Sequence, residues 1–282
     1  MTDTTAPLPP PAVVEILDFE QILATRKAAL LALLPADQRP AIAEVLALES
    51  EPLTKLLEES AYREMYLRAR INDAARANLI IYANGADLDH IGYLFGLPRL
   101  AGELDPRYRS RLLLRIAAMA GNGTREHYQL IALGVSLEVV GSAVLQPAAS
   151  RVDIALWLKP GADAVALLAA ARAAYAAPGV KMLGVELGVR LAVAKPITLS
   201  GRIWRETSAP TDLAQQVAAQ FPAQLAAYAQ LGRSVSRSWI LSALHRPGVA
   251  RVELDQLTDI GVGADQYATL GSITLSDGGT SW

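Results

Sequence analysis

The residues of this sequence that could do chemistry do not form a recognisable catalytic or metal-binding set. Its three histidines, His90, His127 and His245, lie far apart, and none has the spacing of a zinc-binding HExxH helix. Cysteine is absent, which excludes disulfides and thiolate metal sites. No nucleophile elbow, Walker A loop or dinucleotide-binding glycine motif is present. Since no nucleophile, general acid and oxyanion site occur together, the sequence predicts no enzyme, no cofactor and no metal site.

Two polar groups resemble functional motifs, but each has a simpler structural explanation. Gly121-Asn122-Gly123 precedes Thr124 at a predicted helix N-terminus, a geometry that can bind anions. It follows a helix rather than a strand, so a plain turn between helices is favoured. Glu58 and Glu59 could imitate a catalytic carboxylate pair. They lie on a charged helix face without a partner base, and a solvated face is the better interpretation.

The composition indicates a soluble, nearly neutral protein. Of 282 residues, 52% are hydrophobic, and 26 basic residues against 28 acidic ones give a net charge of −2. This balance argues against a nucleic-acid-binding protein. Arg107, Arg111 and Arg115 form a basic stripe that could hold phosphate, although a solvated or salt-bridged face is favoured. Charges and a proline interrupt the alanine-rich run at 162–180, so we expect no membrane span there. No signal peptide is visible, so we expect the chain to be made in a reducing compartment.

One long helix organises the elements that would position any functional residue. Ser50 is a plausible N-cap, and no residue from Leu53 to about Ala83 interrupts the helix. Gly85 is the expected left-handed stop. Asp87 is then expected to cap a short helix around Leu88–Phe95.

The long helix is apolar on more than one side. Leu53, Leu57 and Ala61 make one row, and Leu67 and Ile71 belong to another. A helix packed only on its own core would show a single stripe. Two interpretations therefore remain open, a helix partly covered by another chain and a central helix of a helical domain. The apolar candidates for an interface are Leu53, Leu57, Leu67, Ile71 and Leu79.

The remainder of the chain predicts an α+β fold, with a helical segment followed by two small α/β units. The expected divisions are an extended arm at 1–17, helices over 18–100, and α+β units at 105–192 and 195–282. Asp18 and Thr124 are expected helix caps, and Pro222 should kink or break the helix that contains it. The expected strands are Val135–Val140, Arg151–Leu158, Gly184–Val193, Pro196–Trp204, Val249–Leu254 and Ser272–Leu275. The later expected helices are Asp163–Ala176, Pro210–Gln230 and one from Ser236 or Ser238 to Leu244.

Several motifs resemble those of a known family. The run LESEPLTKLLEESAYREMYLRARINDAARANL, followed by GADLDHIGYLFGLPR, closely resembles the baseplate assembly protein J family of contractile-tailed phages. That family also occurs in phage-tail-like bacteriocins (tailocins) and related injection machines. Further matches lie in Val13–Glu20, in Asp105 with Tyr108-Arg109, and in Gly232–Leu254. The match is most specific in the N-terminal third and weaker between 134 and 200.

The resemblance implies a structural role without catalytic residues. Members of the family are baseplate wedge subunits, which pair with a second copy and with a companion wedge protein. The wedges close into a six-fold ring around the central hub and spike, and this ring opens when the sheath contracts. The chain would then be assembled in the host cytoplasm and reside in the baseplate of a virion or tail-like particle. The alternatives are a tail-associated hydrolase and a module that binds the cell surface.

The basic residues add polar candidates for the interface. Arginine outnumbers lysine by 21 to 5, and guanidinium groups pair bidentately with carboxylates, which suits an interface that must switch. The polar candidates on the long helix are Arg63, Arg68, Arg70 and Arg76.

Overall fold

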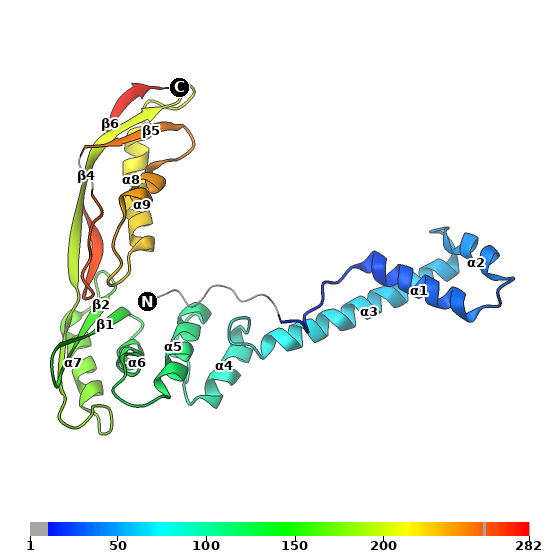
Figure 1. Ribbon diagram of the computed structural model, residues 1–282, viewed down its shortest axis with the longest axis horizontal. Coiled ribbons are helices and arrows are strands. Elements are labelled where there is room, and N and C mark those ends of the chain that lie inside the picture. Colours follow the sequence, from blue (N-terminus) through cyan, green and yellow to red (C-terminus); the bar gives the residue numbers. More distant parts are fainter. Residues whose placement is uncertain (1–10, 256–257, 282) are drawn as a thin grey trace. The chain divides into compact units, whose positions relative to one another are not determined.

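The computed structural model describes residues 11–255 and 258–281, and Figure 1 labels its helices and strands. Its contacts divide the chain into two compact units. Unit 1 contains the residues up to Arg99 together with Leu104–Arg109, and unit 2 contains Leu100–Glu103 and the chain from Ser110 onward. Residues 1–10 of the predicted arm lie outside the described residues. In the described part of the chain, no helix is both long and apolar enough to cross a membrane.

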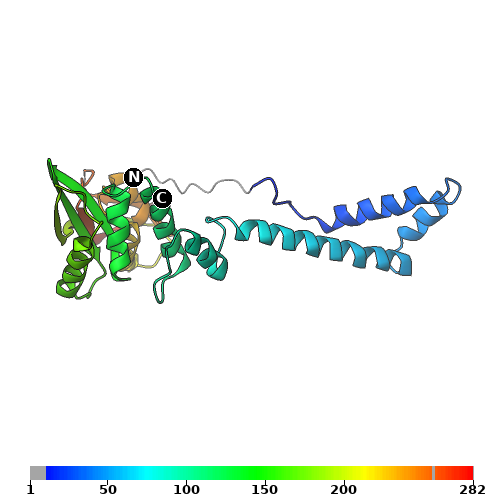
Figure 2. The same cartoon turned by 90° about the horizontal axis from the view of Figure 1, so that it is seen from below.

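Unit 1 is helical. Its first helix lies antiparallel beside the long third helix, and the short second helix joins them, as Figure 2 shows. The contact between them is apolar, with Ile22 and Leu23 packed against Ala61. The Lys27 ammonium donates to the Leu46 carbonyl at 2.7 Å, which ties the first helix to the second. The helices of this unit are α1 Phe19–Leu33, α2 Arg39–Leu46, α3 Pro52–Ala77 and α4 Gly85–Leu94, followed by the start of α5, Asp105–Ala118.

The ends of the long helix differ from the prediction. Its N-cap is Glu51 rather than Ser50, and it ends at Ala77 rather than Ala83. The end follows from local chemistry, because the Asn78 amide donates to the Ala74 carbonyl at 2.8 Å and competes with the helical hydrogen bonds. Gly85 does have a left-handed φ of 52°, but it begins α4, so Asp87 lies within the first turn of that helix and is not its cap.

The first sheet of unit 2 has three strands in the order β1-β2-β3. Strand β1 (Val139–Ala148) is antiparallel to β2 (Arg151–Leu158), and β3 (Glu186–Leu191) is parallel to β2. Helices α6 (Arg125–Val135) and α7 (Ala164–Ala176) pack on it. The predicted strand at Val135–Val140 is therefore mostly wrong, because the helix capped by Thr124 continues to Val135. Strand β2 matches its prediction at both ends. The core is formed by Tyr128, Ala132, Val139, Ile154, Leu156, Ala171 and Tyr175.

A second three-stranded sheet follows directly, in the order β5-β4-β6. Ala192 alone separates β3 from β4 (Val193–Arg205), which pairs antiparallel with β5 (Val249–Leu254) and parallel with β6 (Gln266–Thr280). Ile197, Leu199 and Ile203 on alternate positions of β4 are buried under helices α8 (Leu213–Tyr228) and α9 (Arg237–Leu244). Thr198, Ser200 and Arg202 on the opposite face are exposed, which is the period of a half-buried strand.

Two predictions for this second sheet need correction. Helix α8 continues through Pro222 without a break. Pro222 is exposed, whereas Phe221 and Leu225 beside it are buried in the core and hold both halves in place. Strand β6 is much longer than the predicted Ser272–Leu275. The α+β class is confirmed, with helices at the N-terminus and two small mixed sheets after them.

A small junction links the two sheets of unit 2. The Val193 main-chain N–H donates to the Asp265 carbonyl at 2.9 Å, and the Arg190 guanidinium contacts the Asp265 carboxylate at 2.6 Å. The rings of Trp157 and Tyr267 stack with centroids 5.1 Å apart. This stack and the ion pair hold the sheets together where only Ala192 connects their strands.

Candidate functional site

The long helix α3 has a covered side and an open side. On the covered side, Leu57, Ala61 and Met65 pack against α1. Five large apolar residues on the remaining surface are exposed, and they span about half of the helix circumference at 100° per residue. We call this set the open face: Leu56, Tyr62, Tyr66, Leu67 and Ile71.

The open face carries several large, exposed apolar side chains. Tyr62, Tyr66, Leu67 and Ile71 have exposed fractions of 58%, 62%, 64% and 59%. Tyr62, Arg63, Tyr66 and Leu67 line a shallow hollow of about 480 Å³ with mostly apolar walls. Contiguous exposed apolar surface of this kind marks sites that bind other proteins or ligands. The prediction included Leu67 and Ile71 but missed the two tyrosines, although their four-residue spacing places them on one side of a helix.

Ion pairs on the covered side hold α3 to the N-terminal segment. The Arg26 guanidinium donates to the Ser60 hydroxyl at 2.7 Å and pairs with Glu64. Arg68 bridges Glu64 at 2.7 Å and Glu15 at 2.9 Å. Hydrogen bonds from Arg26 and then Arg68 lower the pKa of Glu64, and those from Glu64 and Glu15 raise the pKa of Arg68. Arg68 is therefore already paired within its own chain.

A buried asparagine reinforces this attachment. Asn72 lies on the covered side, and its side-chain oxygen accepts from the Glu15 main-chain N–H at 3.0 Å. Its amide nitrogen donates to the Glu15 carbonyl at 2.9 Å. Because one side chain satisfies both main-chain groups of Glu15, the segment before α1 is fixed to α3 as a neighbouring strand would be.

The other predicted interface residues fall into different surroundings. Arg63 pairs with Glu59 one turn away, and Arg76 is 4.0 Å from Asp73. Arg70 is exposed and has no carboxylate within ion-pair distance among the described residues. The apolar candidates Leu53, Leu57 and Leu79 are half-buried within the chain.

Two arginines fix the chain where α3 gives way to α4 and α5. The Arg109 guanidinium donates to the Ile80 carbonyl at 2.7 Å and to the Ala83 carbonyl at 2.6 Å. Arg99 pairs with Asp89 at 2.6 Å and with Asp105 at 2.7 Å. The Gly85 N–H donates to Asp105, and this bond, followed by the pairing with Arg99, lowers the pKa of the Asp105 carboxyl. The Arg109 bonds thus satisfy main-chain carbonyls between α3 and α4. The Asp105 carboxylate satisfies the Gly85 N–H, which the start of α4 leaves without a helical partner.

Unit 2 contains a buried ion pair made by Arg111, one of the three arginines of the predicted basic stripe. The Arg111 guanidinium lies 2.5 Å from the Glu103 carboxylate, with side-chain exposures of 4% and 0%. The Leu100 main-chain N–H donates to the same carboxylate at 3.0 Å. For Arg111, the salt-bridged interpretation of the basic stripe is therefore confirmed.

The glycine-rich turn at 121–124 has a structural explanation as well. The Thr124 hydroxyl accepts from the His127 main-chain N–H and caps α6. The Gly123 N–H donates to the His127 Nδ1 at 3.1 Å, and the Asn122 amide donates to the Gly179 carbonyl at 2.8 Å. Burial lowers the pKa of His127, followed by repulsion from Arg115. The turn uses its polar groups within the chain, as the interhelical interpretation predicted.

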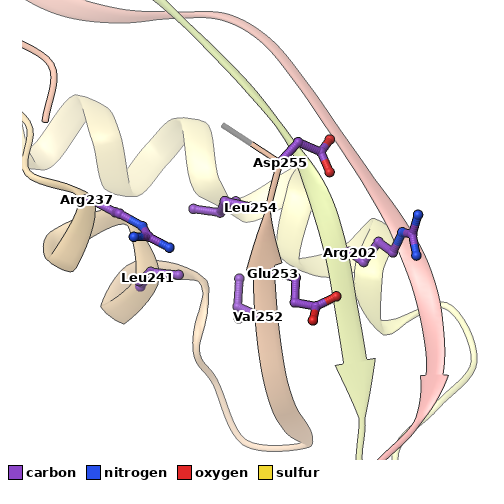
Figure 3. Close-up of a pocket in the computed structure, with 7 residues that line it drawn as sticks. All are labelled: Arg202, Arg237, Leu241, Val252, Glu253, Leu254 and Asp255. Carbon is purple, nitrogen blue, oxygen red and sulfur yellow. The ribbon is translucent and has the colours of Figure 1, made fainter. Parts of the chain in front are cut away.

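A second hollow, of about 440 Å³, lies beside the sheet of β4 and β5 (Figure 3). Arg202 and Arg237 contribute positive charge to its walls, and Glu253 and Asp255 contribute negative charge. Glu253 also accepts from the Trp204 indole at 3.1 Å. The walls are thus balanced in charge. Among the described residues, no three His, Asp or Glu side chains are grouped in a way that could hold a metal ion.

Comparison with known proteins identifies the family. Residues 49–103 match the model of the baseplate J-like N-terminal domain. The chain is 34% identical over 292 aligned positions to baseplate protein J of Escherichia phage P2, with 97% of each chain covered. The chain belongs to the baseplate J family. The region that matches the J-like N-terminal domain contains all of α3 and α4, and therefore the open face. Arg99 and its partner Asp89 also lie within it, whereas Asp105 lies just beyond its end.

Proposed function

We propose that this chain is a structural subunit of the baseplate wedge of a contractile tail or tail-like particle. The observation that carries the proposal is the open face of α3, which lies within the baseplate J-like domain. A second copy of the chain and a companion wedge protein would cover this face and complete a shared helical bundle. Membership of a family that includes a phage baseplate protein supports a structural role in the baseplate rather than an enzymatic one.

In this proposal the wedges close into a six-fold inner ring around the hub and spike. The two α+β units of the chain, at 105–192 and 195–282, contact neighbouring wedges, and the ring opens as the sheath contracts. The subunit is assembled in the host cytoplasm and becomes part of the baseplate. The near-balance of 26 basic and 28 acidic residues supports polar interfaces that can separate and reform, because neither sign of charge dominates.

The interface on α3 combines exposed apolar side chains with charged ones. Leu67 and Ile71 would be buried by the partner, and burial of each such side chain is worth about 1.5–3 kcal/mol. Arg70 would pair with a carboxylate of the partner. Arg68 contributes indirectly, since its bonds to Glu15 and Glu64 fix the opposite side of the helix.

Co-expression with the neighbouring baseplate proteins tests the proposal. We expect the wild-type chain to co-purify with a companion in a complex larger than the monomer, measured by light scattering after size exclusion. Replacing both Leu67 and Ile71 by Glu should reduce this co-purification at least tenfold. Val165→Glu is the matched control, because Val165 is an exposed apolar residue on α7, outside the open face. A wild-type chain that stays a lone monomer with every neighbour would refute the wedge assignment.

A further inference from the structure

The two edges of the β5-β4-β6 sheet are built differently. Strand β5 has only six residues and carries the charged side chains of Arg251 and Glu253. Strand β6 has 15 residues and contains no lysine, arginine or proline. Edge strands of proteins that remain monomeric are usually short or protected by such residues, because a free edge can pair with another chain. The sequence thus protects β5 and leaves β6 open.

The outer side of β6 is free over most of its length. At one end the Gln266 carbonyl accepts from the Gly232 N–H at 2.9 Å, and at the other the Gly279 N–H donates to the Asp277 side chain at 2.8 Å. Between these ends, the main chain of β6 pairs with β4 and with no other described element. Figure 3 shows β6 as the pink strand beside β4, on the side away from β5.

A regular segment lies in the middle of this edge. Residues 272–277 pair one-to-one with residues 198–203 of β4, and irregularities lie on either side of the segment. Within it, Ile273 and Leu275 pack against the core. Ser272, Thr274 and Ser276 are exposed. Such a segment offers an incoming antiparallel strand main-chain donors and acceptors at the alternating close and wide spacing of an antiparallel pair.

We propose that this edge pairs with the β6 strand of a second copy, antiparallel and with the two-fold axis at Thr274. The proposal rests on the wedge assignment for its biological setting and adds a second contact between copies, apart from α3. In this register Ile273 of each copy lies opposite Leu275 of the other, and Ser272 lies opposite Ser276. Apolar pairs of this kind stabilise neighbouring strands.

The charge on β6 favours an identical strand as the partner. Asp277 is the only charged side chain of β6, and Arg205 already pairs with it at 3.3 Å. A strongly basic or acidic partner strand would therefore find no complementary charge. With the axis at Thr274, Asp277 lies opposite Gly271, so the two carboxylates do not face each other. An antiparallel pair of identical strands also closes on itself as a dimer and leaves no second end for polymerisation.

Single cysteine variants of the full chain test the register, because the chain has no cysteine of its own. Directly opposite residues in an antiparallel pair have Cα atoms about 4.5–5.5 Å apart, which suits a disulfide. We expect Thr274→Cys to form a disulfide-linked dimer under mild oxidation. A mixture of Ser272→Cys and Ser276→Cys chains should form the mixed dimer in preference to either homodimer. Arg251→Cys on the edge strand β5 is the matched control and should crosslink at least tenfold more slowly.

Charge substitution at the same position tests the pairing without crosslinks. Thr274→Lys and Thr274→Glu each place like charges opposite each other on the axis, so each variant alone should dimerise at least tenfold more weakly than the wild type. Mixing the two should restore dimers that contain one chain of each kind. Sedimentation equilibrium measures the dimers, and an unchanged unfolding midpoint for each variant confirms that its own fold is intact.

Combination with the α3 substitutions separates this proposal from the wedge assignment. In a chain that carries Leu67→Glu and Ile71→Glu, crosslinking at Thr274→Cys should persist even though co-purification with a companion is lost. Crosslinking no faster than that of Arg251→Cys would overturn β6 pairing and leave the α3 interface standing. Failure of the mixed Thr274→Lys and Thr274→Glu chains to regain dimer formation would also overturn it. A crosslink from residue 274 to a different baseplate protein in assembled particles would do the same.

Discussion

Substitution of Gly92 tests the packing between α4 and the start of α5. In an ordinary helix interior, replacing glycine with alanine stabilises the protein by about 0.5–1 kcal/mol. Here a Cβ atom would lie 1.7 Å from the hydroxyl oxygen and 2.6 Å from the Cζ of Tyr108. The Tyr108 ring is buried, and its hydroxyl donates to the Leu97 carbonyl at 2.6 Å. The ring cannot move aside without losing this hydrogen bond.

We therefore expect Gly92→Ala to destabilise unit 1. Overpacking costs about 1–3 kcal/mol, and leaving the buried Leu97 carbonyl without its donor costs a further 1–3 kcal/mol or so. Subtracting the ordinary gain for alanine leaves a net loss of about 1–5 kcal/mol in the free energy of unfolding of this unit. Gly134→Ala is the matched control, since its Cβ would meet no atom within 4 Å in α6, and it should be neutral or stabilising.

The two units can be followed separately in one experiment. The three tryptophans among the described residues, Trp157, Trp204 and Trp239, belong to unit 2, and no tryptophan precedes them in the sequence, so tryptophan fluorescence in urea reports the unfolding of this unit. Hydrogen exchange of peptides covering 85–97 reports α4. Gly92→Ala should accelerate exchange there and leave the tryptophan transition unchanged.

A double-mutant cycle with Tyr108→Phe identifies the cause. Removing the hydroxyl eliminates the 1.7 Å contact, so Gly92→Ala should cost less in the phenylalanine background, by about 1–2 kcal/mol. A stabilising Gly92→Ala, or effects of the two substitutions that simply add, would refute this account of the packing.

Three further predictions concern the arginines. Arg111→Met should destabilise unit 2 by about 3–5 kcal/mol, because it removes the guanidinium that pairs with the buried Glu103 carboxylate, and Arg111→Met combined with Glu103→Leu should recover most of the loss in urea unfolding. Arg190 lowers the pKa of Asp265, so the pair stabilises the protein above the ordinary carboxyl pKa and loses this contribution as pH falls through the lowered value. Arg190→Met should therefore flatten the pH dependence of the tryptophan unfolding transition below about pH 4. An unchanged pH profile would contradict this assignment. Arg109→Met should lower the free energy of unfolding of unit 1 by about 1–3 kcal/mol and accelerate hydrogen exchange over 78–84, because two main-chain carbonyls after α3 lose their donor. Arg125→Met, on the exposed start of α6, is the control and should change neither quantity.

Features that depend on a few neighbouring residues were predictable. Asp18 accepts from the N–H groups of Glu20 and Gln21, and Thr124 accepts from that of His127, as expected of helix caps. Strand β2 was predicted at its observed bounds because its apolar residues alternate over its whole length. In each case the determining contacts lie within a few positions along the chain.

The errors arose where distant residues or weak patterns decide the structure. Asn78 ends α3 early through its own amide, and Arg109, from a helix that begins 27 residues later, then supplies donors to the carbonyls that follow. Most of β6 was not predicted, because its glycines and serines obscure the sequence pattern of a strand. Its full length depends on its pairing with β4. The open face was only partly predicted, since the sequence alone could not show which side of α3 would be covered by α1.

The sequence by itself determined the α+β class, the family resemblance and the excess of apolar surface on the long helix. These follow from composition, local spacing and residue identity, which do not require knowledge of the packing. Only the tertiary structure decided that Arg68 is paired within its own chain, that Tyr62 and Tyr66 lie on the open face, and that β6 has a free edge. Exposure and pairing depend on what distant segments cover, and this becomes defined only when α1 packs on α3 and β4 takes its place between β5 and β6.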